Sequence, residues 1–341
     1  MSISEFESTL NQWGRDQVPF LFLVDFEMEN LLAWKIGETP KAVLFSINEP
    51  PDLFRFAPAP AKNKALFPSP SEGGRRRERA RAMVRLHPLS LSDYKSKFDF
   101  VQGRIHVGDS YLTNLTIKTK IELSFSLEEL FFASIAKYKL CWKNRFLVFS
   151  PEPFIQIKNG KIFSFPMKGT IDAALHDAAE KIFSDPKELS EHVTIVDLIR
   201  NDLSAIATKV TVNRFRYAER IRTDRKDLLQ VSSEISGDLS GNYASTIGTI
   251  LISLLPAGSV SGAPKKKTIQ IIREAEKEKR GFYTGVFGCF DGRNLDSAVM
   301  IRFIEQAGEN FYYRSGGGIT AQSEVEKEYQ EAIDKIYVPV Y

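Results

Sequence analysis

Two charged residues lie in settings that could support covalent and acid–base chemistry. Lys168 follows the strand-like stretch 161–165 and precedes a Gly-Thr pair, while Glu152 lies between two prolines that restrict its backbone. A lysine that acts as a nucleophile must be neutral, so burial or positive neighbours have to lower its pKa well below about 10.4. From the residues alone, ordinary surface charge is the simpler interpretation of both positions.

An arginine and a glycine run are two candidate anion-binding features. Arg302 interrupts the otherwise apolar stretch 298–304, and a buried guanidinium needs an anion or hydrogen-bond acceptors because it does not deprotonate. The glycines Gly316–Gly318 follow the strand-like run 310–314, and a glycine loop can turn its N–H groups toward an anion. An arginine with an exposed or internally paired head, and a plain flexible turn, are the alternatives.

The stretch 323–336 combines an apolar stripe with an acidic flank, as expected of an amphipathic helix. Glu328 borders the stripe, and Glu324, Glu331 and Lys335 lie on the same flank. Carboxylates at positions i and i+3 of a helix can share a hard cation such as Mg²⁺. A solvated acidic helix face is the alternative, and composition alone favours it.

The bulk composition is that of a globular protein with one large or two modest domains. Of the 341 residues, 43% are hydrophobic and 26% are charged, and the net charge of +3 gives no strong attraction to nucleic acid. The two cysteines lack metal-like spacing and suit a reducing compartment. The N-terminus lacks the blocks of a signal peptide, and no apolar run approaches the roughly 20 residues of a membrane span. We therefore expect a soluble, cytoplasmic protein that binds neither nucleic acid nor membrane.

The predicted elements mix strands and helices without strict alternation, which favours an α+β fold over a doubly wound sheet. Short apolar runs predict strands at 18–26, 42–47, 105–107, 145–149, 162–165, 283–291 and 297–304. Helical patterns cover 191–203, 268–280 and 323–336. Residues 57–74 have a loop composition, and the arginine-rich stretch 75–85 is more typical of a solvated helix or mobile loop than of a nucleic-acid patch.

Eight short stretches, taken together and in order, resemble the chorismate-binding enzymes. This family includes anthranilate synthase large subunit, aminodeoxychorismate synthase component I, isochorismate synthase and salicylate synthase. The ordered set is far more specific than any one of its motifs. The stretches are SPEPF (150–154), PMKGT (166–170), EHVTIVDLIRNDL (191–203), PAGSVSGAPK (256–265), YTGVFG (283–288), AVMIRF (298–303), SGGGI (315–319) and EYQEAIDK (328–335).

The resemblance implies an α+β fold with a large antiparallel β-sandwich core and flanking helices. It assigns residues 92–341 to the chorismate-binding catalytic region, expected to be one integrated domain. Residues 1–91 would form a shortened N-terminal portion with a possible loop at 57–74. Chorismate is the substrate that the resemblance implies, and Mg²⁺ is the cofactor.

Position by position, the resemblance also implies roles for individual residues. Lys168 would attack C2 of chorismate as a covalent nucleophile, and Glu152 would protonate the departing C4 hydroxyl as a general acid. Four carboxylates would hold Mg²⁺ and, through it, the ring carboxylate of chorismate: Glu188, Glu191, Glu328 and Glu331. The other substrate-binding residues would be Gly169, Thr170, Arg302, Gly316, Gly317, Gly318 and Lys335, with Arg302 on the enolpyruvyl side and the glycines as backbone donors.

The identity of residue 168 decides the expected product. In the family, enzymes that place an amine at C4 carry lysine here, whereas those that form anthranilate, isochorismate or salicylate usually carry alanine. An amine on the carbon that lost the hydroxyl takes two allylic displacements, in which lysine can be the temporary substituent. The chain is therefore similar to aminodeoxychorismate synthase component I of para-aminobenzoate and folate synthesis, with ammonia from a separate glutamine amidotransferase subunit. Anthranilate or isochorismate formation, and a subunit that binds without turnover, are the alternatives.

Two positions depart from the family pattern. Gln230 stands where many relatives have histidine, and it can hydrogen-bond but cannot transfer a proton. Cys289 stands where several relatives have tyrosine, so one hydroxyl to a substrate carboxylate would be lost. Neither departure touches the expected metal residues or Lys168.

Overall fold

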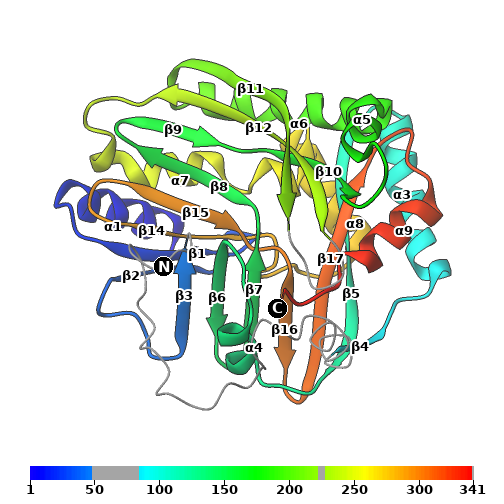
Figure 1. Ribbon diagram of the computed structural model, residues 1–341. Helices are drawn as coiled ribbons and strands as arrows, with labels where there is room; N and C mark the ends of the chain where they lie inside the picture. The colour runs from blue at the N-terminus through cyan, green and yellow to red at the C-terminus, as the bar shows by residue number, and fades with distance from the viewer. Residues whose placement is uncertain (48–83, 222–226, 340–341) are drawn as a thin grey trace.

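The computed structural model describes residues 1–47, 84–221 and 227–339. Within these ranges the strands form two antiparallel sheets that pack together, with helices around them (Figure 1). This arrangement of two large sheets and flanking helices confirms the α+β sandwich expected from the sequence.

The first sheet fills the upper and left parts of Figure 1. Its strands in spatial order are β10 (Met167–Asp172), β12 (Leu228–Asp238), β9 (Lys161–Ser164), β8 (Pro153–Lys158), β15 (Leu295–Val299), β14 (Val286–Phe290), β1 (Phe20–Val24) and β2 (Leu31–Lys35). The long strand β11 (Thr208–Ile221) pairs with β12 outside this path.

The second sheet places the long strands β5 and β17 next to each other. Its order is β13 (Gly262–Ala263), β5 (Leu112–Leu123), β17 (Asn310–Ile319), β16 (Phe303–Ala307), β7 (Phe146–Ser150), β6 (Tyr138–Trp142) and β3 (Val43–Ile47). Strand β4 (Val84–His87) pairs with β5. The N-terminal portion thus supplies strands to both sheets, because β1 and β2 belong to the first sheet and β3 and β4 to the second.

Strand β1 shows why some strands of this chain are apolar throughout. Phe20, Phe22 and Val24 pack into a cluster with α1 (Ile3–Arg15) and α7 (Ile247–Leu254), while Leu21 and Leu23 pack into another cluster with β3 and β6. All five residues of the strand are fully buried. A strand with both faces in the core needs an unbroken apolar run, and this run made the strand predictable.

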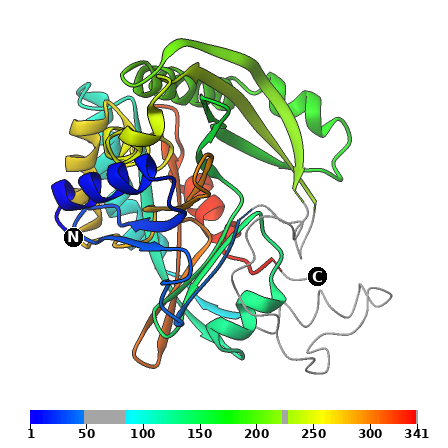
Figure 2. The same ribbon diagram turned by 90° about the vertical axis from the view of Figure 1, so that its left-hand side faces the viewer.

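Helices pack against strands of both sheets. Besides α1 and α7, the helices within the described residues are α3 (Leu91–His106), α4 (Leu127–Ala133), α5 (Ala178–Ser184), α6 (Pro186–Ser204), α8 (Lys265–Glu276) and α9 (Val325–Asp334). In Figure 2, α1 and α7 lie together on one side of the molecule, and α9 lies near the centre beside β17. Helix α6 packs against β10, β11 and β12, and α9 packs against β17 and α3.

Most predicted elements within the described residues are confirmed, but the strand predicted at 105–107 is wrong. Ile105 instead ends the buried face of α3, where it follows Tyr94, Phe98 and Val101 at helical spacing. The three-residue apolar run was too short to separate the two possibilities. The loop predicted at 57–74, and the arginine-rich stretch up to residue 83, lie outside the described residues.

One apolar stretch is longer than the sequence analysis allowed. Residues 243–260 have a mean hydropathy of 1.4 over 18 residues, enough in length and composition for a membrane-spanning helix. The structure divides this stretch into the 3₁₀ turn η2 (Tyr243–Thr246), α7 and the 3₁₀ turn η3 (Gly258–Val260). Because α7 packs against α1 with its apolar residues in the core, the stretch serves as a core segment of this fold.

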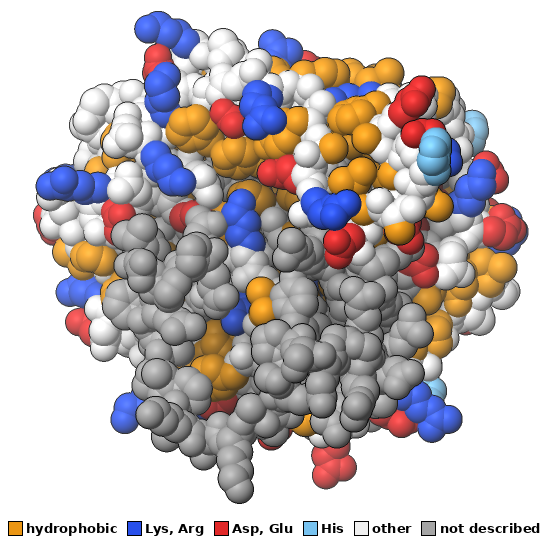
Figure 3. Space-filling view, in the orientation of Figure 1, with side chains coloured by type: hydrophobic (Ala, Val, Ile, Leu, Met, Phe, Trp, Pro, Cys, Tyr) orange, Lys and Arg blue, Asp and Glu red, His pale blue; other side chains and the backbone are white. Residues whose placement is uncertain are grey.

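The described surface carries charges of both signs. On the face shown in Figure 3, Lys and Arg side chains alternate with Asp and Glu side chains among apolar ones. This mixture fits the small net charge of +3.

Candidate active site

A cavity of about 170 Å³ lies between β10 of the first sheet and β17 of the second. Helix α6 and the end of α9 also contribute to its wall. The structure brings nearly all of the expected site residues to this cavity, although they come from distant parts of the sequence. Those that line it are Glu152, Lys168, Gly169, Thr170, Glu188, Glu191, Arg302, Gly316, Gly317, Gly318, Glu331 and Lys335.

The start of helix α6 positions two of the carboxylates. Asp185 caps the helix by accepting hydrogen bonds from the N–H groups of Lys187 (2.8 Å) and Glu188 (3.1 Å), and Pro186 occupies the first turn. One turn later comes Glu191, whose side chain is 7% exposed. Burial and the nearby Glu191 and Glu331 raise the pKa of Glu188 to about 7. The first turns of α6 therefore concentrate negative charge at the cavity.

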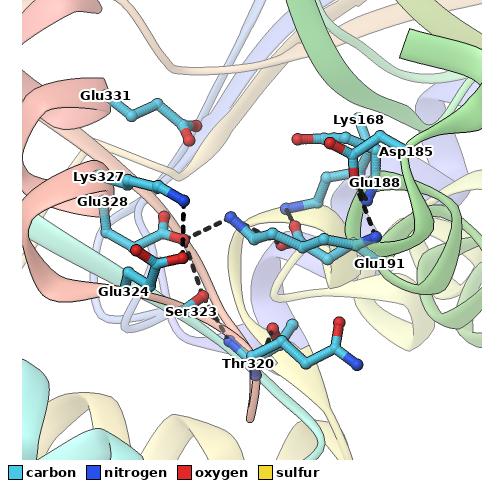
Figure 4. Close-up of polar contacts among 12 residues, drawn as sticks. Lys168, Asp185, Glu188, Glu191, Thr320, Ser323, Glu324, Lys327, Glu328 and Glu331 are labelled. Atoms are coloured by element: carbon cyan, nitrogen blue, oxygen red, sulfur yellow. Dashed lines mark hydrogen bonds and ion pairs between the residues drawn. The ribbon is translucent and has the colours of Figure 1, made fainter. Parts of the chain in front are cut away.

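Helix α9 supplies the opposing carboxylates. Figure 4 shows Glu328 and Glu331 turned toward Glu188 and Glu191 across a shared space. The Lys335 ammonium lies 2.5 Å from the carboxylate of Glu331 and holds the pKa of Glu331 at about 2. Burial instead raises the pKa of Glu328, whose side chain is 1% exposed and lies just behind the cavity wall.

The glycine run is a strand, so the expectation of a glycine loop is wrong. Gly316 and Gly318 pair with Thr116 and Asn114 of β5, and β17 continues to Ile319. The neighbour on the other edge, β16, ends its pairing at Arg314, and no other described strand pairs with that edge beyond this residue. The Gly316 carbonyl on this edge accepts a hydrogen bond of 2.9 Å from Lys335 Nζ. Backbone groups alternate between strand edges, so the Gly318 N–H also faces the open edge.

Lys168 lies within strand β10, where the ladder with β12 shifts register between Lys168 and Thr170. Its Nζ is 3.6 Å from Glu191 Oε2, and its side chain is 14% exposed. Gly169 has a φ of +78°, and a Cβ there would lie 2.6 Å from Glu188 Oε2. Glycine at this irregular position therefore lets β10 pass close to α6 while Lys168 points into the cavity.

Glu152 lies between β7 and β8 and is almost fully buried. Ser259 Oγ donates a hydrogen bond of 2.5 Å to Glu152 Oε1. Burial raises the pKa of this carboxyl, against the opposing effects of the Ser259 hydrogen bond and the charges of Lys168 and Arg302. A carboxyl that keeps its proton longer than usual is suited to donate it to a leaving group.

Arg302 occupies a break in the sheet, although the sequence predicts a continuous strand through it. Strand β15 ends at Val299 and β16 begins at Phe303, and Arg302 has a φ of +54°. Its Nε has no hydrogen-bond partner in the described structure, and its guanidinium lies 5.2 Å from the Tyr337 ring centroid. This unusual backbone conformation directs the Arg302 side chain toward the cavity, where its Nε–H is an unused hydrogen-bond donor.

Comparisons with known proteins identify the family to which this site belongs. Residues 61–340 match the family described as chorismate binding enzyme. The chain belongs to the chorismate-binding enzyme family.

Similar proteins include members with different products. An uncharacterised PabA-like protein of Pasteurella multocida is 47% identical over the full length of both chains. Aminodeoxychorismate synthase component 1 of Salmonella typhimurium is 32% identical, and the match covers 73% of this chain and 57% of that protein. The menaquinone-specific isochorismate synthase of Escherichia coli is 16% identical, with a TM-score of 0.68 over 97% of this chain and 80% of that one. These comparisons establish the family and the fold, but they do not select the product.

The two departures from the family pattern lie in different places of this chorismate-binding enzyme. Gln230 lines the cavity on β12, opposite Thr170 of β10. Cys289 lies instead in the apolar core with Leu21 and Phe287, fully buried on β14. The expected loss of a substrate contact at Cys289 is therefore wrong for this fold, whereas Gln230 can still face a ligand.

Several residues of the site escaped the sequence analysis. Lys187 contacts two of the carboxylates, and Ser259 holds the carboxyl of Glu152. The i, i+4 spacing of Lys187 and Glu191 was a readable signal in the sequence. Ser259 lies in the quoted stretch 256–265, but its role depends on a contact across 107 positions that no local pattern reveals.

A buried ion pair behind the cavity was also missed. Glu276 and Arg280 are both 1% exposed and lie 2.6 Å apart. Arg280 donates to the carbonyls of Val260 and Asn114, and Glu276 accepts from both the N–H and the hydroxyl of Thr116. Asn114 and Val260 line the cavity. The Glu276–Arg280 ion pair therefore joins its own segment to the segments of Asn114 and Val260 behind the cavity wall.

Gly318→Ala is expected to reduce turnover of chorismate at least about tenfold without unfolding the protein. A Cβ at this position would lie 2.7 Å from Lys168 Nζ and 3.2 Å from Glu191 Oε2, so both groups must move. Steady-state kinetics and thermal unfolding of the variant measure the two effects. The control is Gly103→Ala on α3, where an added Cβ meets nothing within 4 Å. Equal activity of the two variants would contradict the close approach of Gly318 to Lys168.

Proposed function

We propose that this chorismate-binding enzyme converts chorismate and ammonia to 4-amino-4-deoxychorismate and water, as component I of an aminodeoxychorismate synthase. The observation that carries the proposal is the primary amine of Lys168, which lies in the cavity beside Glu191. An amine at this place can serve as a temporary covalent substituent, which an alanine cannot. The product would serve para-aminobenzoate and folate synthesis in the cytoplasm.

We assign Mg²⁺ to the carboxylates of α6 and α9. Glu191 and Glu328 would hold it, with Glu188 and Glu331 beside them. The raised pKa values of Glu188 and Glu328 support the assignment, because they reflect burial and crowded negative charge that a cation would relieve. The ammonium of Lys187 stands among these oxygens as a stand-in cation. When bound, Mg²⁺ would neutralise the ring carboxylate of chorismate.

The cationic residues of the cavity suit the remaining charge of a dicarboxylate substrate. Arg302 has an unused donor and would bind the enolpyruvyl carboxylate. Contacts with the Gly316 carbonyl and Glu331 hold Lys335 Nζ at the cavity. There it would bind the other carboxylate of the substrate. The Gly318 N–H on the open edge of β17 would add a backbone donor.

The proposed reaction proceeds in two displacements at the ring. In the first, the Lys168 amine forms a bond to C2, both ring double bonds shift by one position, and the C4–O bond breaks as Glu152 protonates the leaving hydroxyl, which departs as water. In the second, ammonia forms a bond to C4, both double bonds shift back, and the C2–N bond breaks to release the Lys168 amine. The proton lost from the ammonia nitrogen restores Glu152, so the enzyme is regenerated.

Ammonia would come from a separate glutamine amidotransferase subunit. The similar protein of Salmonella typhimurium is named as component 1, which supports a two-component arrangement. Free ammonium at high concentration should replace the partner in an assay, because the amine-transfer chemistry lies in this chain.

Incubation of the purified chain with chorismate, Mg²⁺ and ammonium salt tests the proposal. Product identification by mass spectrometry and NMR should show an amine at C4. Anthranilate or isochorismate, both substituted at C2, would overturn the assignment in favour of the related reactions. Binding of chorismate without turnover, with ammonium in excess, would show instead a subunit that only binds.

A further inference from the structure

A lysine occupies the space between the carboxylates of the two helices. Lys187 Nζ lies 2.5 Å from Glu328 Oε1 of α9 and 3.6 Å from Glu191 Oε1 of α6. The Glu328 and Glu191 side chains are 1% and 7% exposed, whereas that of Lys187 is 28% exposed. The two carboxylates are therefore fixed within the protein, and the lysine reaches them from the surface.

The contacts of Lys187 link α6 to α9. Its ammonium pairs with Glu191 of α6 and with Glu328 of α9, so one cation serves carboxylates on both helices. Ser323 Oγ donates a second hydrogen bond, of 2.8 Å, to the same Glu328 oxygen. This oxygen thus has two donors, one of them charged, in the metal-free chain.

In the metal-free chain, the Lys187 ammonium contacts Glu191 and Glu328, the two carboxylates proposed to hold Mg²⁺. Among the described residues, no group of three acidic, histidine or cysteine side chains lies close enough together to hold a metal. Mg²⁺ needs oxygens at about 2.0–2.1 Å, closer than the oxygens of an ammonium hydrogen bond. The Glu328 oxygen nearest to Lys187 cannot serve both cations, and the two positive charges would repel each other.

We infer that Lys187 is a built-in competitor for the divalent cation: it neutralises Glu191 and Glu328 in the metal-free chain and leaves them when Mg²⁺ binds. The inference rests on the proposed metal site. Lys187 is partly exposed and lies in the first turn of α6, so its side chain has a route into solvent. The competition reduces the apparent affinity for Mg²⁺ to the intrinsic affinity of the carboxylates multiplied by the fraction of time that the lysine leaves them free.

Titration of the metal-free protein with Mg²⁺ or Mn²⁺, without chorismate, tests the inference. Lys187→Met keeps the apolar stem and removes the charge, and we expect it to bind either ion about tenfold or more tightly than the wild type by calorimetry. Without metal, the variant should unfold at a lower temperature, since Glu191 and Glu328 lose their counter-ion. Saturating Mg²⁺ should therefore raise its melting temperature by more than that of the wild type.

Two control variants make the result specific. Lys327 lies on the surface of α9 and pairs with Glu324 at 2.6 Å. Lys327→Met removes this surface charge and should change metal affinity less than twofold. Lys187→Arg keeps the charge and should keep the weak affinity. Tighter binding in both Lys187→Met and Lys327→Met would mean that general charge is responsible, and it would overturn the inference.

The remaining outcomes separate this inference from the metal proposal. Equal or weaker binding by Lys187→Met, with binding abolished by Glu191→Gln, would overturn the role of Lys187 and leave the metal site in place. No binding by either the wild type or Lys187→Met would refute the metal site and the inference with it. A Lys187→Met that fails to fold is replaced by Lys187→Gln, for which the same outcomes apply.

Discussion

Replacing Lys168 by alanine is expected to lower the formation of 4-amino-4-deoxychorismate at least about 10³-fold, because it removes the proposed nucleophile. The fold should survive the change. Lys168 contacts Glu191 at 3.6 Å, and Glu191 retains a second cation, Lys187, at the same distance. Because Lys187 keeps Glu191 from becoming an unpaired buried charge, the loss of unfolding free energy should stay below the about 3–5 kcal/mol that breaking a buried ion pair outright costs.

The fate of chorismate in this variant is as informative as the rate. Without the amine, the space beside C2 can admit water, and any remaining product should carry a hydroxyl at C2. NMR of the products detects this redirection. Intact-protein mass spectrometry of the wild type, with ammonia withheld, should show an adduct with the mass of chorismate less water, which the variant lacks.

The matched control for Lys168 lies in the same sheet, on β9, which β12 separates from β10. Lys161→Ala on β9 removes an exposed lysine that pairs with Asp238 at 2.7 Å, far from the cavity lining. It should leave both rate and product unchanged. If Lys168→Ala also kept the wild-type rate and product, Lys168 would have no covalent role.

The sequence was sufficient to predict which residues meet, but not how the backbone carries them. Glu152, Lys168 and Arg302 belong to ordered motifs, and the structure places all three at one cavity. The Gly316–Gly318 run was expected to be a loop that turns its N–H groups toward an anion. It is a strand because β5 supplies the ladder, and only a backbone without side chains can pass so close to Lys168 and Glu191.

Long-range contacts explain the other differences. The break at Arg302 lies in an apolar run that looks continuous, since positive φ at a single residue leaves no periodic signal. Ser259 and Glu152 are separated by 107 positions, and Lys187 and Glu328 by 141. Propensity and periodicity are local properties, so these pairings became visible only when the two sheets and α6 and α9 were in place.

Replacing Glu152 by glutamine is expected to lower the rate about 10²–10⁴-fold, the usual contribution of a general acid. Glutamine keeps the shape of the side chain and can still bond Ser259, but it has no proton to give to the leaving hydroxyl. In the wild type, the acid is active only while protonated, so its rate should fall as the pH rises through the raised pKa of Glu152. The residual rate of the variant should lack this decline.

The stability of the same variant should change in the opposite direction to its activity. Because the pKa of Glu152 is raised in the folded state, the folded protein binds the proton more tightly than the unfolded chain does. The carboxylate therefore destabilises the fold increasingly as the pH rises from its ordinary pKa to the raised one. Glutamine carries no such penalty, so denaturant unfolding should show Glu152→Gln at least as stable as the wild type at pH 8, with a smaller loss between pH 5 and pH 8.

Ser259→Ala tests whether the pH at which the rate declines follows the pKa of Glu152. The hydrogen bond from Ser259 lowers the pKa of Glu152, so its removal should raise that pKa further and move the decline in rate to higher pH. A shift to lower pH, or a Glu152→Gln variant with the wild-type pH profile, would assign the decline to another group. Together the two substitutions distinguish an acid whose proton is used in the reaction from a buried carboxyl that only supports the wall of the cavity.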